Sequence, residues 1–193
     1  VIDNYYRVGV SDNESWLQLV APEVKVKTMD IRQLSILKRY VTKNHFDVII
    51  HEAAQTAVTT SVEDPAYDFE ANVRGTFNVM EAARASGCSV VYASTNKVYG
   101  AMSTVRVWED DTRWKYADAD LHRFGVAEDA PLDPISPYGC SKLSGEHYVR
   151  DYARIYGVKT VSFRQSCVYG PRQLGGTDQG WLTWFTRAWM LGK

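Results

Sequence analysis

Residues 47–93, DVIIHEAAQTAVTTSVEDPAYDFEANVRGTFNVMEAARASGCSVVYA, contain the pattern that best indicates the fold class. The apolar runs at 47–54 and 89–93 each predict a buried strand. Between them, residues 65–86 have the period of a long helix, with proline in the first turn and glycine directly after the end. A strand, a helix and a strand in this order form a unit whose strands are parallel.

The same alternation continues on both sides of this unit. Further strands are predicted at residues 1–2, 24–29 and 159–164, and helices at 34–44 and 137–156. This order predicts an α/β fold: a Rossmann-like, doubly wound parallel sheet with helices on both faces. Ligands of such sheets bind beyond the carboxyl ends of the strands, so candidate functional residues are sought there.

Composition excludes several classes of protein. Of the 193 residues, 45% are hydrophobic and 23% charged, which is ordinary for a globular protein. The net charge of −1 and the lack of a Lys/Arg-rich run argue against nucleic-acid binding, and no apolar run is long enough to span a membrane. Cys88, Cys140 and Cys167 lack CxxC spacing and are expected to be free thiols in the cytoplasm. The histidines are scattered, so no metal site is predicted.

Acidic residues follow the first two predicted strands. Asp3-Asn4 comes after the first, where a carboxylate would hydrogen-bond the adenosine ribose and repel a phosphate, which favours NAD over NADP. Asp30-Ile31 comes after the second, where the acidic side chain could reach adenine. Both pairs could equally form an Asx turn or a helix N-cap.

Small and hydroxylated residues follow the next two strands. Ala53 and Ala54 would let the backbone approach a flat ligand, with Gln55 beside them. Ser94 and Thr95 directly follow the predicted strand at 89–93, and a hydroxyl at this strand end could hydrogen-bond a substrate oxygen. A Ser-Thr pair of this kind is also common in turns.

Tyr138 and Lys142 are four residues apart and therefore share a helix face, about 5–6 Å apart at Cβ. An ammonium at that distance would lower the pKa of the phenol by roughly 2 units, toward neutral pH. Such a tyrosine can take a proton from an alcohol while hydride leaves the same carbon. Tyr/Lys pairs also occur on exposed helices. The serine-threonine strand end before the pair, and the strand ending in Arg164 after it, favour the catalytic interpretation.

Three motifs carry a family resemblance: STNKVYG at 94–100, SPYGCSK at 136–142 and DQGW at 178–181. Together with VIDN, DIR and HEAAQ, they resemble the extended short-chain dehydrogenase/reductase superfamily of nucleotide-sugar epimerases and dehydratases. Within it, the chain is most similar to the CDP-tyvelose 2-epimerases. The resemblance covers nearly the whole chain.

The resemblance implies a role for each matching residue. Tyr138 is the base and acid, Lys142 lowers its pKa and binds the nicotinamide ribose, and Thr95 holds the reacting sugar oxygen. The implied NAD-binding residues are Asp3, Asn4, Asp30, Ile31, Ala53, Ala54, Gln55, Asn72, Ser94, Tyr138, Lys142 and Ser166. The implied substrate-binding residues are Thr95, Asn96, Cys167, Arg172 and Gln179. Many relatives carry Asn where Cys167 stands.

The resemblance also implies the reaction: transient oxidation of a sugar hydroxyl and return of hydride to the other face of a nucleotide sugar, most simply a CDP-sugar. Asn96-Lys97 stand where the superfamily's 4,6-dehydratases carry Asp-Glu, so dehydration is disfavoured. A UDP-hexose 4-epimerase, another nucleotide-sugar reductase and a non-catalytic dinucleotide sensor are the alternatives. A homo-oligomer, dimer or tetramer, and a place in O-antigen biosynthesis are expected from the resemblance alone.

The domain organisation follows from the same comparison. Residues 1–170 are expected to form a partial NAD-binding domain, and residues 171–193 to begin the C-terminal substrate-binding region. The first strand with its Gly-rich phosphate loop, and most of the C-terminal domain, are expected to be absent. Residues 101–137 are expected to be a long loop insertion. Loops of that length in a compact domain are more often functional than idle, so this loop is expected to have a function.

Overall fold

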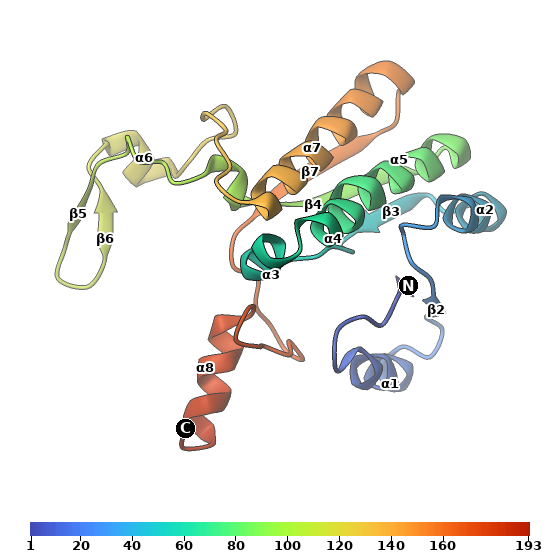
Figure 1. Cartoon of the computed structure of the whole chain (residues 1–193), viewed down its shortest axis with the longest axis horizontal. Coiled ribbons are helices and arrows are strands. Elements are labelled where there is room, and N and C mark those ends of the chain that lie inside the picture. Colours follow the sequence, from blue (N-terminus) through green and yellow to red (C-terminus); the bar gives the residue numbers. More distant parts are fainter.

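The parallel strands form two sheets in the computed structural model, which describes all 193 residues. β1 (Ile2–Asp3) pairs with β2 (Lys27–Thr28), and β4 (Ser89–Thr95) lies between β3 (Val48–His51) and β7 (Thr160–Gln165) (Figure 1). The predicted α/β fold with a Rossmann-like parallel sheet is confirmed. The second strand is much shorter than the predicted 24–29.

The strand order is that of a doubly wound sheet with one position unfilled. In the order 3-2-1-4-5-6, β2 and β1 take positions 3 and 2, and β3, β4 and β7 take positions 4, 5 and 6. No strand of this chain takes position 1, so β1 and β3 belong to separate sheets. The carboxyl ends of all five strands still lie on one side, where a ligand is expected.

Three helices pack together beside the larger sheet. α2 (Leu34–Asn44) packs on α5 (Gly75–Ser86), which packs on α7 (Pro137–Tyr156), and α5 and α7 contact the strands. The core between them includes Met80 and Tyr92, both fully buried.

The other face of this sheet differs from the prediction. It exposes Val48 and Ile50 of β3 and Val161 and Phe163 of β7, because no helix of this chain packs against it. The expected helices on both faces are therefore found on one face only.

The long helix predicted at residues 65–86 is continuous but not uniform. It comprises α4 (Pro65–Asp68), a π-helical segment η1 (Phe69–Arg74) and α5. The wider π turn shifts the side-chain register, so that Asp68 and Asn72 face inward while Phe69 is 54% exposed.

Residues 101–135 form a projecting arm rather than a plain loop. The arm contains an antiparallel hairpin of β5 (Val107–Glu109) and β6 (Trp114–Tyr116), followed by α6 (Ala119–Phe124), and it extends away from the sheet (Figure 1). Gly100 at its base has φ +69°, and a Cβ on it would lie 1.8 Å from the carbonyl oxygen of Asp133. The two chain segments at the base of the arm can approach only because residue 100 has no side chain.

Four further elements complete the chain. They are α1 (Val10–Val20), α3 (Val58–Glu63), the 3-10 turn η2 (Asn96–Tyr99) and α8 (Trp181–Met190). Of these elements, α1 and α3 were not predicted from the sequence. None of the helices has the length and apolar character that crossing a membrane requires.

Gly100→Ala is expected to destabilise the fold more than Gly125→Ala. Both glycines have positive φ, 69° and 79°, but nothing lies within 4 Å of a Cβ on Gly125. Gly125→Ala therefore costs only backbone strain, about 1–3 kcal/mol. Gly100→Ala adds a backbone clash of about 1–3 kcal/mol. The measurement is the free energy of unfolding in denaturant, and equal losses in the two variants would contradict the close approach to Asp133.

Candidate active site

Thr95 and Tyr138 lie together at the carboxyl end of β4. Thr95 ends the strand and accepts a hydrogen bond from the backbone N–H of Lys97 (3.2 Å), which lies in η2. Tyr138 lies in the first turn of α7. The helix begins here because the Ser136 hydroxyl caps it, accepting a hydrogen bond from the Gly139 N–H at 3.1 Å, and because Pro137 occupies the first helical position. Both side chains are buried, 6% and 8% exposed.

The pKa of Tyr138 differs from the sequence-based expectation. Burial of the phenol raises it above the ordinary value, the Thr95 side chain lowers it, and the charge of Asp68 raises it further. Lys142 is not among the groups that shift it. The expected lowering by Lys142 is therefore not found, because desolvation of the phenolate is the larger effect in this structure.

Lys142 lies one turn deeper along α7 and is only 3% exposed. Its Nζ sits 4.4 Å from the centroid of the Tyr92 ring, and the Tyr92 hydroxyl donates to the Lys142 carbonyl (3.2 Å). Burial lowers the pKa of Lys142 to about 8, against the charges of Glu52, Asp68 and Glu146, which raise it. Part of the population is therefore deprotonated at mildly alkaline pH.

His51 is a buried neighbour of Lys142 at the end of β3. Burial, and next the Lys142 charge, lower its pKa to about 3, so the imidazole is neutral at pH 7. Its Nε2 lies 3.0 Å from Thr76 Oγ1. The ring is a packing partner of Tyr92 rather than an acid or base.

A buried hydrogen-bond network lies behind these residues. Asp68 Oδ1 accepts from Gln55 Nε2 (2.8 Å) and from Asn72 Nδ2 (3.1 Å). Asn72 Nδ2 is also 3.1 Å from Ser141 Oγ, and the Ser141 hydroxyl donates to the Tyr138 carbonyl (3.0 Å). The network joins the loop after β3, the π-helical segment and the first turn of α7. Asn72 thus links the loop after β3 to α7.

A second polar anchor lies on the other side of α7. The Arg164 guanidinium at the end of β7 pairs with both oxygens of Glu146, at 3.0 and 3.2 Å. It also donates to the Tyr99 hydroxyl and to the Glu128 carbonyl, both at 2.9 Å. Arg164 therefore ties α7 and η2 to the base of the arm.

The Ser94 hydroxyl oxygen is fully enclosed and has no hydrogen-bond partner. It is 4% exposed and lies at the end of β4, next to Thr95. An unpartnered buried hydroxyl is costly unless something satisfies it. Its position therefore fits a polar ligand at this end of the sheet.

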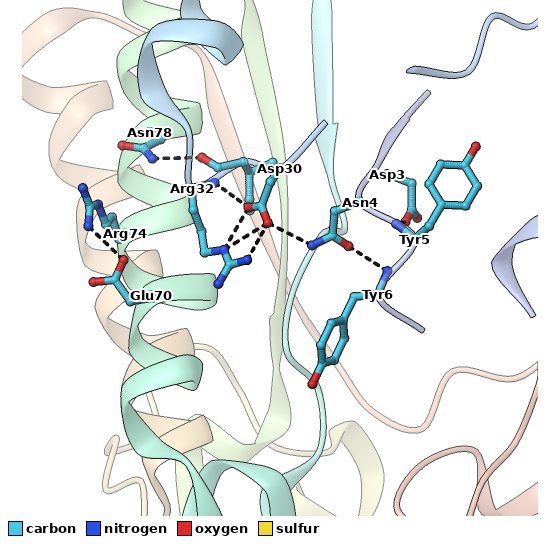
Figure 2. A network of polar contacts seen from close by, with 10 residues as sticks. Asp3, Asn4, Tyr5, Tyr6, Asp30, Arg32, Glu70, Arg74 and Asn78 are labelled. Carbon is cyan, nitrogen blue, oxygen red and sulfur yellow. Dashed lines mark hydrogen bonds and ion pairs between the residues drawn. The ribbon is translucent and has the colours of Figure 1, made fainter. Parts of the chain in front are cut away.

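A separate polar cluster lies at the carboxyl ends of β1 and β2 (Figure 2). Asp30 is bound by the Arg32 guanidinium at 2.6–3.1 Å and by Asn4 Nδ2 at 3.1 Å. Chiefly because of Arg32, the pKa of Asp30 falls to about 2. Asp3 Oδ1 accepts from the Tyr5 N–H (2.7 Å) in an Asx turn. The turn interpretation of Asp3 is therefore confirmed, and its second carboxylate oxygen has no partner within the chain.

Other predicted cofactor residues border this edge of the sheet. Ile31 packs on Gly75, where a Cβ would lie 2.5 Å from its Cδ1. Ala53 is exposed and Ala54 half-buried in the loop after β3, and Ser166 is exposed just beyond β7. The Gln55 side chain is turned inward and bonded to Ala57 and Asp68.

The predicted substrate residues do not converge on Tyr138. The Arg172 guanidinium contacts Asn13 and the Asp12 carbonyl, both at 3.3 Å, and covers the Trp16 ring of α1. Gln179 donates to the Thr56 carbonyl.

The other two predicted substrate residues are exposed. The Trp181 indole donates to Cys167 Sγ at 3.4 Å, on the segment leading to α8. Asn96 lies beside Thr95 at the start of η2. Of the predicted substrate set, Thr95 and Asn96 are therefore the two at the candidate active site.

Comparison with known proteins agrees with this geometry. A profile of the NAD dependent epimerase/dehydratase family matches residues 3–193. The chain belongs to this family. It is 44% identical over 187 residues to CDP-paratose 2-epimerase from Salmonella typhi, and 35% identical over 177 residues to a putative UDP-glucose 4-epimerase from Methanocaldococcus jannaschii.

Solved structures of other proteins share the fold. UDP-glucose 4-epimerase from Thermus thermophilus, in complex with NAD, superposes with a TM-score of 0.71 at 33% identity, over 92% of this chain and 50% of that one. Pal from Bacillus thuringiensis gives a TM-score of 0.81 at 26% identity, over 98% and 54% of the two chains.

The chain spans about half the length of the curated relatives it matches: 54% of the Salmonella protein and 52% of the Methanocaldococcus protein. The matches cover 96% and 90% of this chain.

The Thr95→Val variant is expected to raise the pKa of Tyr138 further, because it removes the hydroxyl that lowers it. NMR titration of [13Cζ]tyrosine, with the signal assigned by its loss in Tyr138→Phe, measures the shift. Thr104→Val, on the exposed arm, is the control and should leave the titration unchanged. A Tyr138 pKa that stays the same or falls in Thr95→Val would show that the two hydroxyls do not interact.

Proposed function

We propose that this chain carries the catalytic residues of an NAD-dependent nucleotide-sugar epimerase that inverts C2 of a CDP-linked sugar. The observation that carries the proposal is the buried convergence of Thr95, Tyr138 and Lys142 at the carboxyl end of β4. The 44% identity to CDP-paratose 2-epimerase supports the choice of substrate class.

Tyr138 is the proposed base and acid. Its phenol is buried, so a substrate that covers it excludes water from the proton transfer. Thr95 Oγ1 would hydrogen-bond the same sugar oxygen and keep it in line with the phenol. Ser94, Asp3 and Lys142 would hold NAD, which would supply the acceptor for the hydride from the sugar carbon and then the donor that returns it to the opposite face. The phenol returns its proton to the sugar oxygen at the end.

The residues present fit NAD. Ser94 offers an unpartnered buried hydroxyl where the cofactor would lie, and Asp3 offers a carboxylate oxygen to a ribose. The buried Lys142 is a donor without an acceptor in hydrogen-bond range, so ribose hydroxyls would satisfy it. The carboxylate of Asp3 disfavours the extra phosphate of NADP.

Epimerisation is favoured over dehydration. Elimination of water needs a paired acid and base, and the residues directly after Thr95 are Asn96 and Lys97. Neither is a carboxylate.

A UDP-hexose 4-epimerase is the second candidate. The identities to the Methanocaldococcus and Thermus proteins favour it. Proton NMR of the product distinguishes the two: inversion at C2 supports the leading proposal, and inversion at C4 the alternative.

We also infer a homo-oligomer, dimer or tetramer, that works in the cytoplasm and supplies O-antigen synthesis. Exposed apolar side chains on α7, Tyr148, Ile155 and Tyr156, support a helical contact between subunits. Three free cysteines are consistent with a reducing compartment.

Tyr138→Phe is expected to reduce turnover of a CDP-hexose in the whole protein by at least about 10²-fold, because it removes the proton that the reaction transfers. Tyr148→Phe, on the same helix but 41% exposed, is the control and should keep full activity. Turnover and unfolding are measured on the same samples. Near-normal epimerisation by a folded Tyr138→Phe protein would refute the assignment of the base.

A further inference from the structure

We propose that Asp68 is a positioning residue whose buried carboxylate, without forming a direct ion pair, is the counter-charge of the Lys142 ammonium at the floor of the site. No sequence motif singled out this residue. Its catalytic consequence rests on the proposed function, but the charge interaction does not.

Asp68 is unusual because its carboxyl group is almost completely buried. It ends α4, directly before the π-helical segment, and is 1% exposed. Acidic side chains are almost never buried so completely without a partner. Burial raises the pKa of Asp68, whereas the nearby Ser141 and Gln55 side chains and the charge of Lys142 oppose that rise.

The hydrogen bonds of Asp68 point it at α7. Oδ1 accepts from two side-chain amides, Gln55 Nε2 and Asn72 Nδ2, and Asn72 in turn contacts Ser141. Ser141 is the residue immediately before Lys142. A carboxylate suits this position because it only accepts hydrogen bonds, and the Gln55 and Asn72 amides each donate one to it.

The other acidic groups near Lys142 are less able to serve as its counter-charge. Glu146, one turn further along α7, is committed to Arg164 at 3.0–3.2 Å. Glu52, in the loop after β3, raises the pKa of Lys142 more than Asp68 does. It is exposed, however, so water screens its charge and its side chain is not fixed beside the ammonium.

The remaining titratable groups around Lys142 are uncharged at pH 7. His51 of β3 is neutral, and burial raises the pKa of both Tyr92 and Tyr138 above the ordinary value. Asp68 is therefore the buried acidic group near Lys142 that has no cation of its own.

The charge of Asp68 reaches both halves of the catalytic pair. It raises the pKa of Lys142 and also that of Tyr138. Removing a negative charge should therefore lower both pKa values together. Replacing a residue with a purely structural role would not shift the pKa values of Lys142 and Tyr138 in the same direction.

The test is an NMR titration of the full chain labelled with [13Cε]lysine and [13Cζ]tyrosine, with signals assigned by Lys142→Met and Tyr138→Phe. Lys142 should titrate near pH 8 in the unmodified protein. In Asp68→Asn its midpoint should fall by about one pH unit. The Tyr138 midpoint should fall as well.

Asp64→Asn is the matched control. Asp64 caps the same helix four residues earlier but is exposed, and asparagine is an equally good cap. Both midpoints should stay unchanged in it. If Asp68→Asn does not fold, Asp68→Ser removes the same charge with a smaller side chain and is titrated instead.

Unchanged Lys142 and Tyr138 midpoints in a folded Asp68 variant would overturn the proposal, as would equal shifts in Asp64→Asn. These outcomes are independent of epimerase activity, because no substrate is turned over in the titration. Loss of the proposed function and loss of this inference are therefore separate results.

Discussion

Burial of the Lys142 ammonium is the constraint on which the arrangement of the site depends. A charged group removed from water costs several kcal/mol unless nearby groups compensate. Here the centroid of the Tyr92 ring lies 4.4 Å from Lys142 Nζ, and the charges of Glu52, Asp68 and Glu146 also stabilise the ammonium. Tyr92 can reach the helix because residue 145 is glycine, where a Cβ would lie 2.2 Å from the Tyr92 hydroxyl oxygen. The close contact of α7 with β4 thus places lysine and tyrosine beside Thr95.

The polar residues at the ends of the strands form two clusters of different character. The group around Tyr138 and Lys142 is buried, where proton transfer is protected from water and electrostatic effects are strong. The group around Asp3 and Asp30 is only partly buried, and Arg32 lowers the pKa of Asp30 to about 2. The first is suited to chemistry and the second to recognition of a polar ligand. A dinucleotide bound along the edge of the sheet would span both.

The sequence predicted the features that depend on local patterns. The helices at 34–44 and 137–156 and the buried strand before Ser94 follow from apolar periodicity and from clear end signals such as Gly157. The pairing of Tyr138 with Lys142 on one helix face follows from their spacing.

Features that depend on tertiary packing were not predictable in this way. The π turn at Phe69–Arg74 shifts the register within a helix of ordinary composition, and so the inward position of Asp68 was missed. An acidic residue four positions before Asn72, on a face otherwise turned to the core, was the one available signal. The pKa of Tyr138 was misjudged because the burial of the phenol cannot be read from spacing. Arg172 is polar and follows a strand, but its contacts are with α1, which was itself not predicted.

The most direct test of the central claim is the absorbance of reduced nicotinamide when a CDP-hexose is added to the whole protein carrying NAD. A base at Tyr138 that oxidises a sugar hydroxyl predicts transient absorbance that rises on mixing and decays as the epimer forms. A folded, NAD-bound protein that binds the nucleotide sugar and never reduces its nicotinamide would contradict the account and favour a non-catalytic dinucleotide sensor.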